Sequence, residues 1–124
     1  MVVPVPPEDF GAQGLRAVHQ AIDRATPLNS NLRLLGHLVT RFDGRLLVHR
    51  AYLQKLQSIY GDSVFETVIP EAAAFKLALT CREPVTIRCP RSRAAERIRD
   101  LGREISGRIE LPITAAEPET IAQC

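Results

Sequence analysis

The sequence predicts an α/β fold, a three-layer sandwich built around a parallel β-sheet. Short runs of β-branched and apolar residues alternate with amphipathic segments of helical period, in units of roughly 30 residues. Such units join parallel strands through right-handed helical crossovers. The run 32–40 is apolar almost throughout, which is typical of a strand covered on both faces.

The composition narrows the class of protein. With 124 residues, the chain suits one modest domain, and the formal charge of +2 is too small to indicate a nucleic-acid partner by itself. Of its 16 cationic side chains, all but Lys55 and Lys76 are arginines, whose planar guanidinium groups suit phosphate. The cysteines and histidines lack the spacing of a zinc site, so no metal site is expected. Neither a membrane-length apolar run nor a signal peptide is evident, so we expect no membrane partner and a cytoplasmic location.

The first strand is predicted at Val2–Val5, where β-branched residues precede two prolines. A helix is then expected to start at Pro7, with Glu8 in its first turn, where an acid meets the positive end of the helix dipole. Apolar residues recur at helical spacing up to Pro27, which ends the pattern.

The second and third strands are predicted at Leu32–Thr40 and Val64–Ile69. Between them, Asp43-Gly44 predicts a turn and an amphipathic helix follows, ended by Gly61. We expect the free edge of the first strand to pair with a second copy or to be covered by a terminal segment such as 110–124.

Beyond Pro70 the sequence predicts a short helix at 71–79, an extended piece at Val85–Arg88 and a last helix after Pro90. These elements complete a partial α/β domain at 1–109. The segment 110–124 has three acids and no base, and it is predicted to be a flexible acidic tail.

The chain resembles the C-terminal half of a ParA/Soj-type partition ATPase, a family of deviant Walker P-loop proteins that also includes MinD. The resemblance covers roughly residues 2–106. It is carried in order by VVPVPPEDFGAQGL, LLGHLVTRFDGR, VFETVIP and the helix start PRSRAA. The fold it implies is the C-terminal part of a P-loop nucleoside triphosphate hydrolase.

The family's phosphate-binding residues are not found in these 124 residues. The sequence has no Gly-Lys dipeptide, so neither GxxxxGK[ST] nor its deviant form is present. Because phosphoryl transfer needs that loop and a carboxylate-held Mg²⁺, we expect no catalytic residues and no ATP hydrolysis by this chain alone. The family's cofactors are ATP and Mg²⁺.

The resemblance implies that Thr40, Arg41 and Pro70 face the adenine. The alternative is that Thr40 only ends a strand and Pro70 only interrupts one. Family members carry Arg-Asn after this proline, whereas Glu71-Ala72 follow here, which is closer to MinD.

The family also binds DNA non-specifically through arginines, and this activity maps to two regions here. Arg45 matches one family arginine, and Lys76 is the cation nearest to a second. Arg91 and Arg93 begin the last helix in a stretch, 82–108, with eight arginines and four acids. The stretch is either a phosphate-binding patch or a solvated helix face with Arg93–Glu96 and Asp100–Arg103 pairs.

Three functions remain open at this stage. The chain is a ParA-like DNA-segregation module of chromosome or plasmid partition, a split ATPase half that needs a separate P-loop segment, or an inactive remnant. The first implies a nucleoid-associated homodimer with non-specific DNA and a ParB-like protein as partners.

Overall fold

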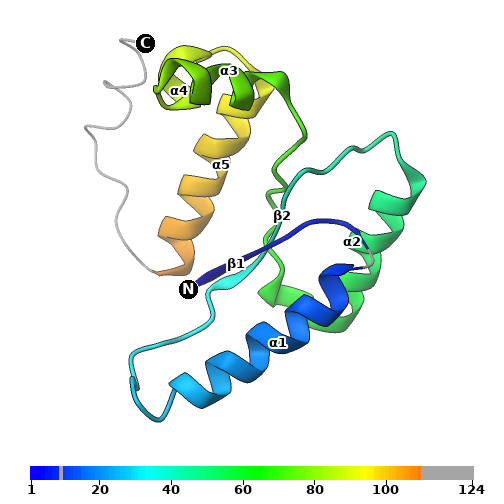
Figure 1. The fold of residues 1–124 in the computed structure, drawn as a ribbon, viewed down its shortest axis with the longest axis vertical. Helices are drawn as coiled ribbons and strands as arrows, with labels where there is room; N and C mark the ends of the chain where they lie inside the picture. The colour runs from blue at the N-terminus through cyan, green and yellow to red at the C-terminus, as the bar shows by residue number, and fades with distance from the viewer. Residues whose placement is uncertain (9, 110–124) are drawn as a thin grey trace. The chain divides into compact units, whose positions relative to one another are not determined.

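A computed structural model of the chain describes residues 1–8 and 10–109 (Figure 1). The chain divides into two compact units, Met1–Val68 and Ile69–Cys124. The predicted acidic tail, 110–124, lies outside the described residues.

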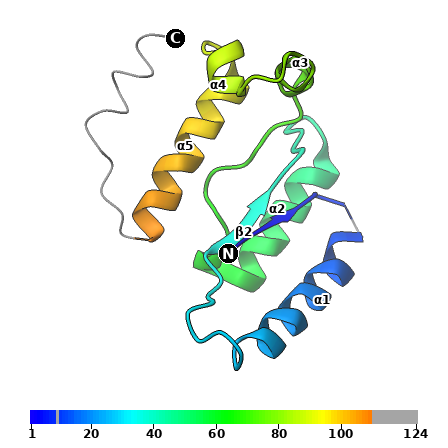
Figure 2. The ribbon, with the colours of Figure 1, turned by 60° about the vertical axis from the view of Figure 1, so that its left-hand side comes forward.

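The first unit contains a parallel two-stranded sheet with helices (Figure 2). Strand β1 (Val2–Val5) pairs in parallel with β2 (Gly36–Val39), with Val2 opposite Gly36 and Val5 opposite Val39. Helix α1 (Phe10–Ala25) connects them, and α2 (Leu47–Tyr60) with the 3-10 turn η1 (Gly61–Ser63) follows β2. The predicted parallel pairing of the first two strands is confirmed.

The predicted third strand is wrong for the described residues. Val64 forms only an isolated parallel bridge with His37, and the Phe65 N–H donates to the His37 carbonyl over 2.9 Å. The chain then bends at Glu66, so its backbone leaves β2 after one step of pairing. The described sheet therefore has two strands where the sequence predicts three.

The outer edge of β1 pairs with no strand in the described part of the chain. Toward β2, the carbonyls of Met1 and Val5 accept bonds from Leu35 and Thr40. Because backbone groups alternate sides along a strand, Pro4 faces the open edge, where it offers no N–H. Whether a second copy or residues 110–124 cover this edge stays a prediction. The exposed proline at the edge removes one donor that an added strand would use.

Two boundaries differ from the prediction. Helix α1 begins at Phe10 rather than Pro7, because the Glu8 N–H bonds back to the Pro6 carbonyl over 2.9 Å in a tight turn. The second strand begins only at Gly36, since Leu32 N–H still donates to Asn29 in a preceding turn. All four β2 residues are buried, as predicted for a strand covered on both faces.

The core of the first unit is aliphatic and lies between the sheet and both helices. Its members are buried apolar residues of β1, α1, β2, α2 and the segment after η1: Val3, Val5, Leu15, Val39, Leu56 and Val64. The predicted end of α2 is confirmed, since Gly61 adopts φ 55° and its N–H donates to the Gln57 carbonyl.

The second unit, as far as it is described, consists of helices α3 (Ala73–Cys81), α4 (Val85–Arg88) and α5 (Arg93–Arg108). Residues 85–88, predicted to be extended, form a helical turn instead. The Pro84 carbonyl accepts from Ile87 and Arg88, because a proline with φ −59° starts a helical turn well.

Small side chains dominate the core of the second unit. Ala78, Val85 and Ala94 are buried together, with Phe75 and Ile98 packed around them. Ser92 begins α5 as an N-cap, accepting the Ala95 N–H over 3.1 Å. The predicted last helix and its start are confirmed. No helix among residues 1–8 and 10–109 is long and apolar enough to cross a bilayer.

Candidate functional site

The residues that the resemblance assigns to adenine lie in both units. Thr40 directly follows β2, is half-buried, and donates its N–H to the Val5 carbonyl over 3.0 Å. Arg41 is exposed and has φ 54°, an uncommon conformation for a side chain of this size. Pro70 is half-buried in the second unit. Thr40 and Arg41 thus lie together at the carboxyl end of a parallel strand, the usual ligand-binding edge of such sheets.

Arg45 lies in the turn after β2 and is held by Asp43. The side chain of Arg45 is 90% exposed, yet its Nε and Nη2 donate to the two Asp43 carboxylate oxygens over 3.1 and 3.0 Å. Hydrogen bonds from the Arg45 side chain and backbone lower the pKa of Asp43 to about 2. The Asp43 carboxylate therefore offsets the positive charge of Arg45, which weakens the attraction of Arg45 for a phosphate group.

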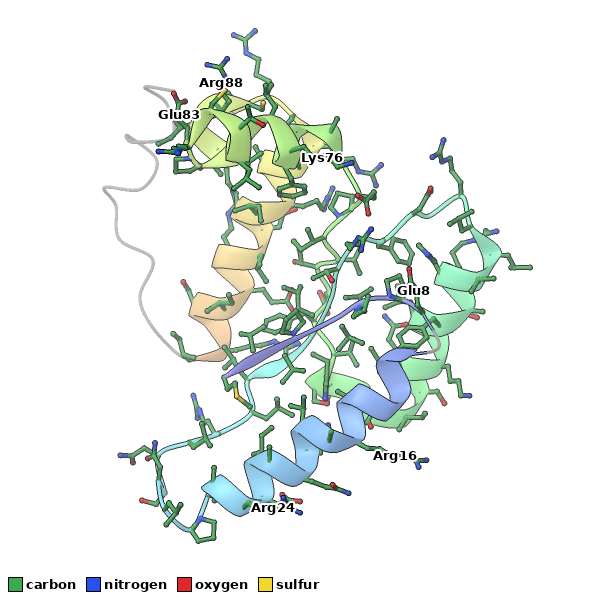
Figure 3. The ribbon with its side chains drawn as sticks, in the orientation of Figure 1. Glu8, Arg16, Arg24, Lys76, Glu83 and Arg88 are labelled. Carbon is green, nitrogen blue, oxygen red and sulfur yellow. The ribbon has the colours of Figure 1, made fainter. Side chains whose placement is uncertain are left out.

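Within the described residues, several cations of the second unit have no acidic partner of the kind that Arg45 has. Lys76 on α3, Arg88 on α4, and Arg91 and Arg93 at the start of α5 are all exposed. None of them forms an ion pair with any residue of the described ranges. Figure 3 shows Lys76 and Arg88 projecting outward at the α3–α4 end of the unit. We call these four residues the cationic patch.

The remaining length of α5 forms ion pairs of the kind that the solvated-face alternative predicts, although several of the paired side chains are half-buried. Arg97 and Arg103 bind the two carboxylate oxygens of Asp100 at 2.8 and 2.7 Å, and Arg108 binds Glu104 at 3.1 Å. The predicted Asp100–Arg103 pair is confirmed. The Arg93–Glu96 pair is not formed, because Glu96 lies 3.8 Å from Arg97 instead. The acids of stretch 82–108 that form ion pairs therefore lie within α5, and Arg88, Arg91 and Arg93 take part in none of these pairs.

One polar cluster of the first unit lies inside the fold. The Nε2 atoms of His19 on α1 and His37 on β2 are 2.9 Å apart. The His19 ring stacks on Tyr60 at the end of α2, and the His37 ring lies tilted against Tyr60. The His37 side chain is fully buried, and its Nδ1 lies 3.2 Å from the Ser63 carbonyl.

The hydrogen bonds of His37 define its protonation. Because a carbonyl only accepts, Nδ1 of His37 carries the proton and its Nε2 accepts from His19. Burial lowers the pKa of His37, and His19 adds to this shift while the Ser63 carbonyl opposes it. His37 is thus the satisfied core histidine that its apolar strand predicts.

Nothing in the described ranges suggests a metal centre. No three His, Cys, Asp or Glu side chains of residues 1–8 and 10–109 are grouped so that they could hold an ion. Cys81 and Cys89 are free, half-buried thiols.

Comparison with known proteins relates the sequence of this chain to a family. The chain is 32% identical over 111 residues to the chromosome-partitioning ATPase Soj of Thermus thermophilus, covering 89% of the chain and 45% of that protein. It is 29% identical over 107 residues to the sporulation initiation inhibitor protein Soj of Bacillus subtilis, covering 86% and 42%. The chain is a homologue of the Soj/ParA chromosome-partitioning ATPases.

The match is also partial. The Soj/ParA homologue spans less than half the length of the curated relatives it matches, consistent with their C-terminal half. An uncharacterized protein of Mycobacterium tuberculosis is 32% identical over 109 residues, 34% of its own length. No protein-family model matches the chain.

Two features of the Soj/ParA homologue escaped sequence reasoning. The His19–His37 contact joins residues 18 positions apart on different elements, and no local pattern indicates it. The Asp43–Arg45 pair had a visible signal, since Asp-Gly-Arg predicts an Asx turn, in which the Asp43 Oδ1 accepts the Arg45 N–H.

Proposed function

We propose that this chain is a DNA-binding module of a ParA-like partition system, and that the cationic patch of the second unit binds the DNA backbone. The observation that carries the proposal is that Lys76, Arg88, Arg91 and Arg93 are exposed and form no ion pair within the described residues. Relatives named as chromosome-partitioning proteins support the biological setting.

The chemistry of the patch suits phosphate. Three of its four members are arginines, whose forked donors match phosphate oxygens better than a lysine does. Because non-specific affinity accumulates over several phosphate contacts, four unpaired cations on one small unit are more useful than one. Arg45, named by the resemblance as a DNA contact, contributes little while Asp43 neutralises it.

A nucleotide role extends this proposal to the first unit. By resemblance, Thr40, Arg41 and Pro70 line the adenine of ATP. The phosphates and Mg²⁺ do not fit a site made of this chain alone, because its 124 residues include neither the glycine-rich loop nor its lysine. Hydrolysis therefore requires a P-loop segment beyond these residues, as in the split-ATPase alternative.

The remaining assignments follow from the same resemblance. We propose a cytoplasmic, nucleoid-associated protein that forms a homodimer and responds to a ParB-like partner. The open edge of β1 supports self-association, although its Pro4 limits pairing through backbone bonds.

The test of DNA binding compares two sets of four cations. Fluorescence anisotropy with a labelled DNA duplex measures the affinity of the whole chain at low salt. Replacing the cationic patch with Ala weakens binding on the order of tenfold or more. The matched control replaces four exposed cations of the first unit: Arg16, Arg24, Arg50 and Lys55. Equal losses in both variants contradict the proposal.

A second assay separates the binding module from the split enzyme. ATP turnover is measured for the chain alone and with an added polypeptide that carries the P-loop of a Soj/ParA relative. Turnover that appears only in the mixture favours the split enzyme. Turnover by the chain alone contradicts both readings.

A further inference from the structure

The first unit contains an apolar groove, lined by helices α1 and α2, that neither the nucleotide nor the DNA proposal uses. The groove measures about 530 Å³. Leu15 of α1 and Leu56 of α2 belong to its lining, and each is only 4% exposed. Val48 and Ile59 of α2 also line it, and they are 68% and 62% exposed. Large apolar side chains exposed at a groove indicate a surface that binds a partner.

The spacing of the lining residues suits a helical occupant. Val48, Tyr52, Leu56 and Ile59 recur every three or four positions, so they lie along one face of α2. At a rise of 1.5 Å per residue, the stretch from Val48 to Ile59 is about 16 Å long, which corresponds to about three helical turns. A groove with apolar residues at this spacing accepts the apolar face of an amphipathic helix.

Both helices contribute a positive charge to the groove. Arg16 of α1 and Lys55 of α2 belong to the lining, are exposed, and form no ion pair within residues 1–8 and 10–109. Figure 3 shows Arg16 projecting outward from α1. Among the described residues the lining contains no acid, and α2 has none over its 14 positions. An occupant with acids on both sides of its apolar face therefore complements the groove.

We propose that the α1–α2 groove binds an acidic amphipathic helix of a partner protein. The apolar face of that helix covers Val48 and Ile59, and its carboxylates pair with Arg16 and Lys55. A second copy of the chain fits less well, because a two-fold contact through this groove brings the same cations together without an acid of the lining to offset them. This inference is independent of DNA or nucleotide binding.

The test uses the tyrosine fluorescence of the whole chain. The chain has two tyrosines and no tryptophan, and both tyrosines, Tyr52 and Tyr60, line the groove. The probe is a synthetic peptide of about 18 residues, long enough to form a helix, with leucines on one face, glutamates on both sides of that face and no aromatic residue. A matched peptide has lysine at every glutamate position. We expect saturable binding of the glutamate peptide, with an affinity roughly tenfold or more above that of the lysine peptide.

Variants of the chain locate the binding site. Ile59→Glu places an acid on the apolar wall and weakens binding of the glutamate peptide roughly tenfold or more. Leu28→Glu, at a 91% exposed position outside the lining, is the matched control and leaves the affinity unchanged. Lys55→Glu weakens binding of the glutamate peptide and strengthens binding of the lysine peptide. Loss of folding cannot produce that reversal.

Each other outcome overturns the proposal. It is overturned by equal affinities for the two peptides, by an affinity that Ile59→Glu leaves unchanged, or by the absence of any response at about 1 mM peptide. A fluorescence change that depends on the concentration of the chain alone, and that Ile59→Glu abolishes, identifies a second copy as the occupant. A response to anionic phospholipid vesicles, with none to the glutamate peptide, identifies a lipid surface instead.

Discussion

Arg45 of the first unit and the arginines before α5 of the second lie in different electrostatic settings. In the first unit, Asp43 lies two residues before Arg45 and holds both sides of its guanidinium group. In the second, Arg91 and Arg93 precede the acids of α5, which bind Arg97, Arg103 and Arg108 instead. The comparison teaches that the position of the nearest acid, more than the number of arginines, decides which cations remain available to a ligand.

The units also differ in how they are held together. The first has an aliphatic core between a sheet and two helices, whereas the second buries mainly alanines among its helices. Large side chains contribute more to stability than small ones, so the first unit is expected to depend on its core and the second on local features such as helix caps.

The largest expected effect tests the core of the first unit. Leu56 is 4% exposed within it, and Leu56→Ala removes buried methyl groups and leaves a cavity. We expect a loss of about 2–5 kcal/mol in the free energy of unfolding, measured in urea. Leu28→Ala, at a 91% exposed position, is the control and changes stability by less than about 0.5 kcal/mol.

The second prediction concerns pH and the buried histidine pair. Because burial lowers the folded-state pKa of His37, the unfolded chain binds the extra proton more readily. Stability is therefore complete above pH of about 6.5 and falls as pH decreases through the folded pKa. The slope is at most about 1.4 kcal/mol per pH unit for one proton. Urea unfolding at several pH values measures it, and stability that rises on acidification would contradict the geometry.

A smaller effect is expected in the second unit. Ser92 caps α5, and Ser92→Ala leaves the Ala95 N–H without its side-chain acceptor. We expect a loss of about 1 kcal/mol. Ser58→Ala, at an exposed position on α2, is the matched control and has little effect. Equal losses would mean that the cap does not stabilise this unit.

The smallest effect sharpens the comparison of arginines. Asp43→Asn keeps the side-chain oxygen that accepts the Arg45 N–H but removes the charge that neutralises the guanidinium group. Arg45 then gains a phosphate contact, so the salt slope of DNA binding steepens by roughly 0.9. Anisotropy titrations at several salt concentrations measure the slope. Arg45→Ala in the Asp43→Asn background should reverse the gain.

Local signals predicted much of this structure. The β-branched run of β1, the glycine that ends α2 and the proline before α5 each act within a few residues, so a sequence window contains their cause. The prediction for Val85–Arg88 was wrong because the β-branched residues of this segment indicate a strand, whereas Pro84 starts a helical turn.

Contacts between segments that are distant in the sequence were harder to predict. Whether Val64–Ile69 continues along β2 depends on a bend at Glu66, and the His19–His37 bond depends on how α1 packs on the sheet. At the candidate site, the sequence identified the cations but not which of them an acid neutralises, because that depends on side-chain geometry.

The central claim is that unpaired cations of the second unit bind DNA phosphate. The most direct measurement is the slope of log K against log salt for the intact chain and for the variant with Lys76, Arg88, Arg91 and Arg93 replaced by Ala. Four lost phosphate contacts predict a slope shallower by roughly 3.6. A slope that is unchanged in this variant, or one that changes equally when Arg16, Arg24, Arg50 and Lys55 are replaced, would contradict the claim.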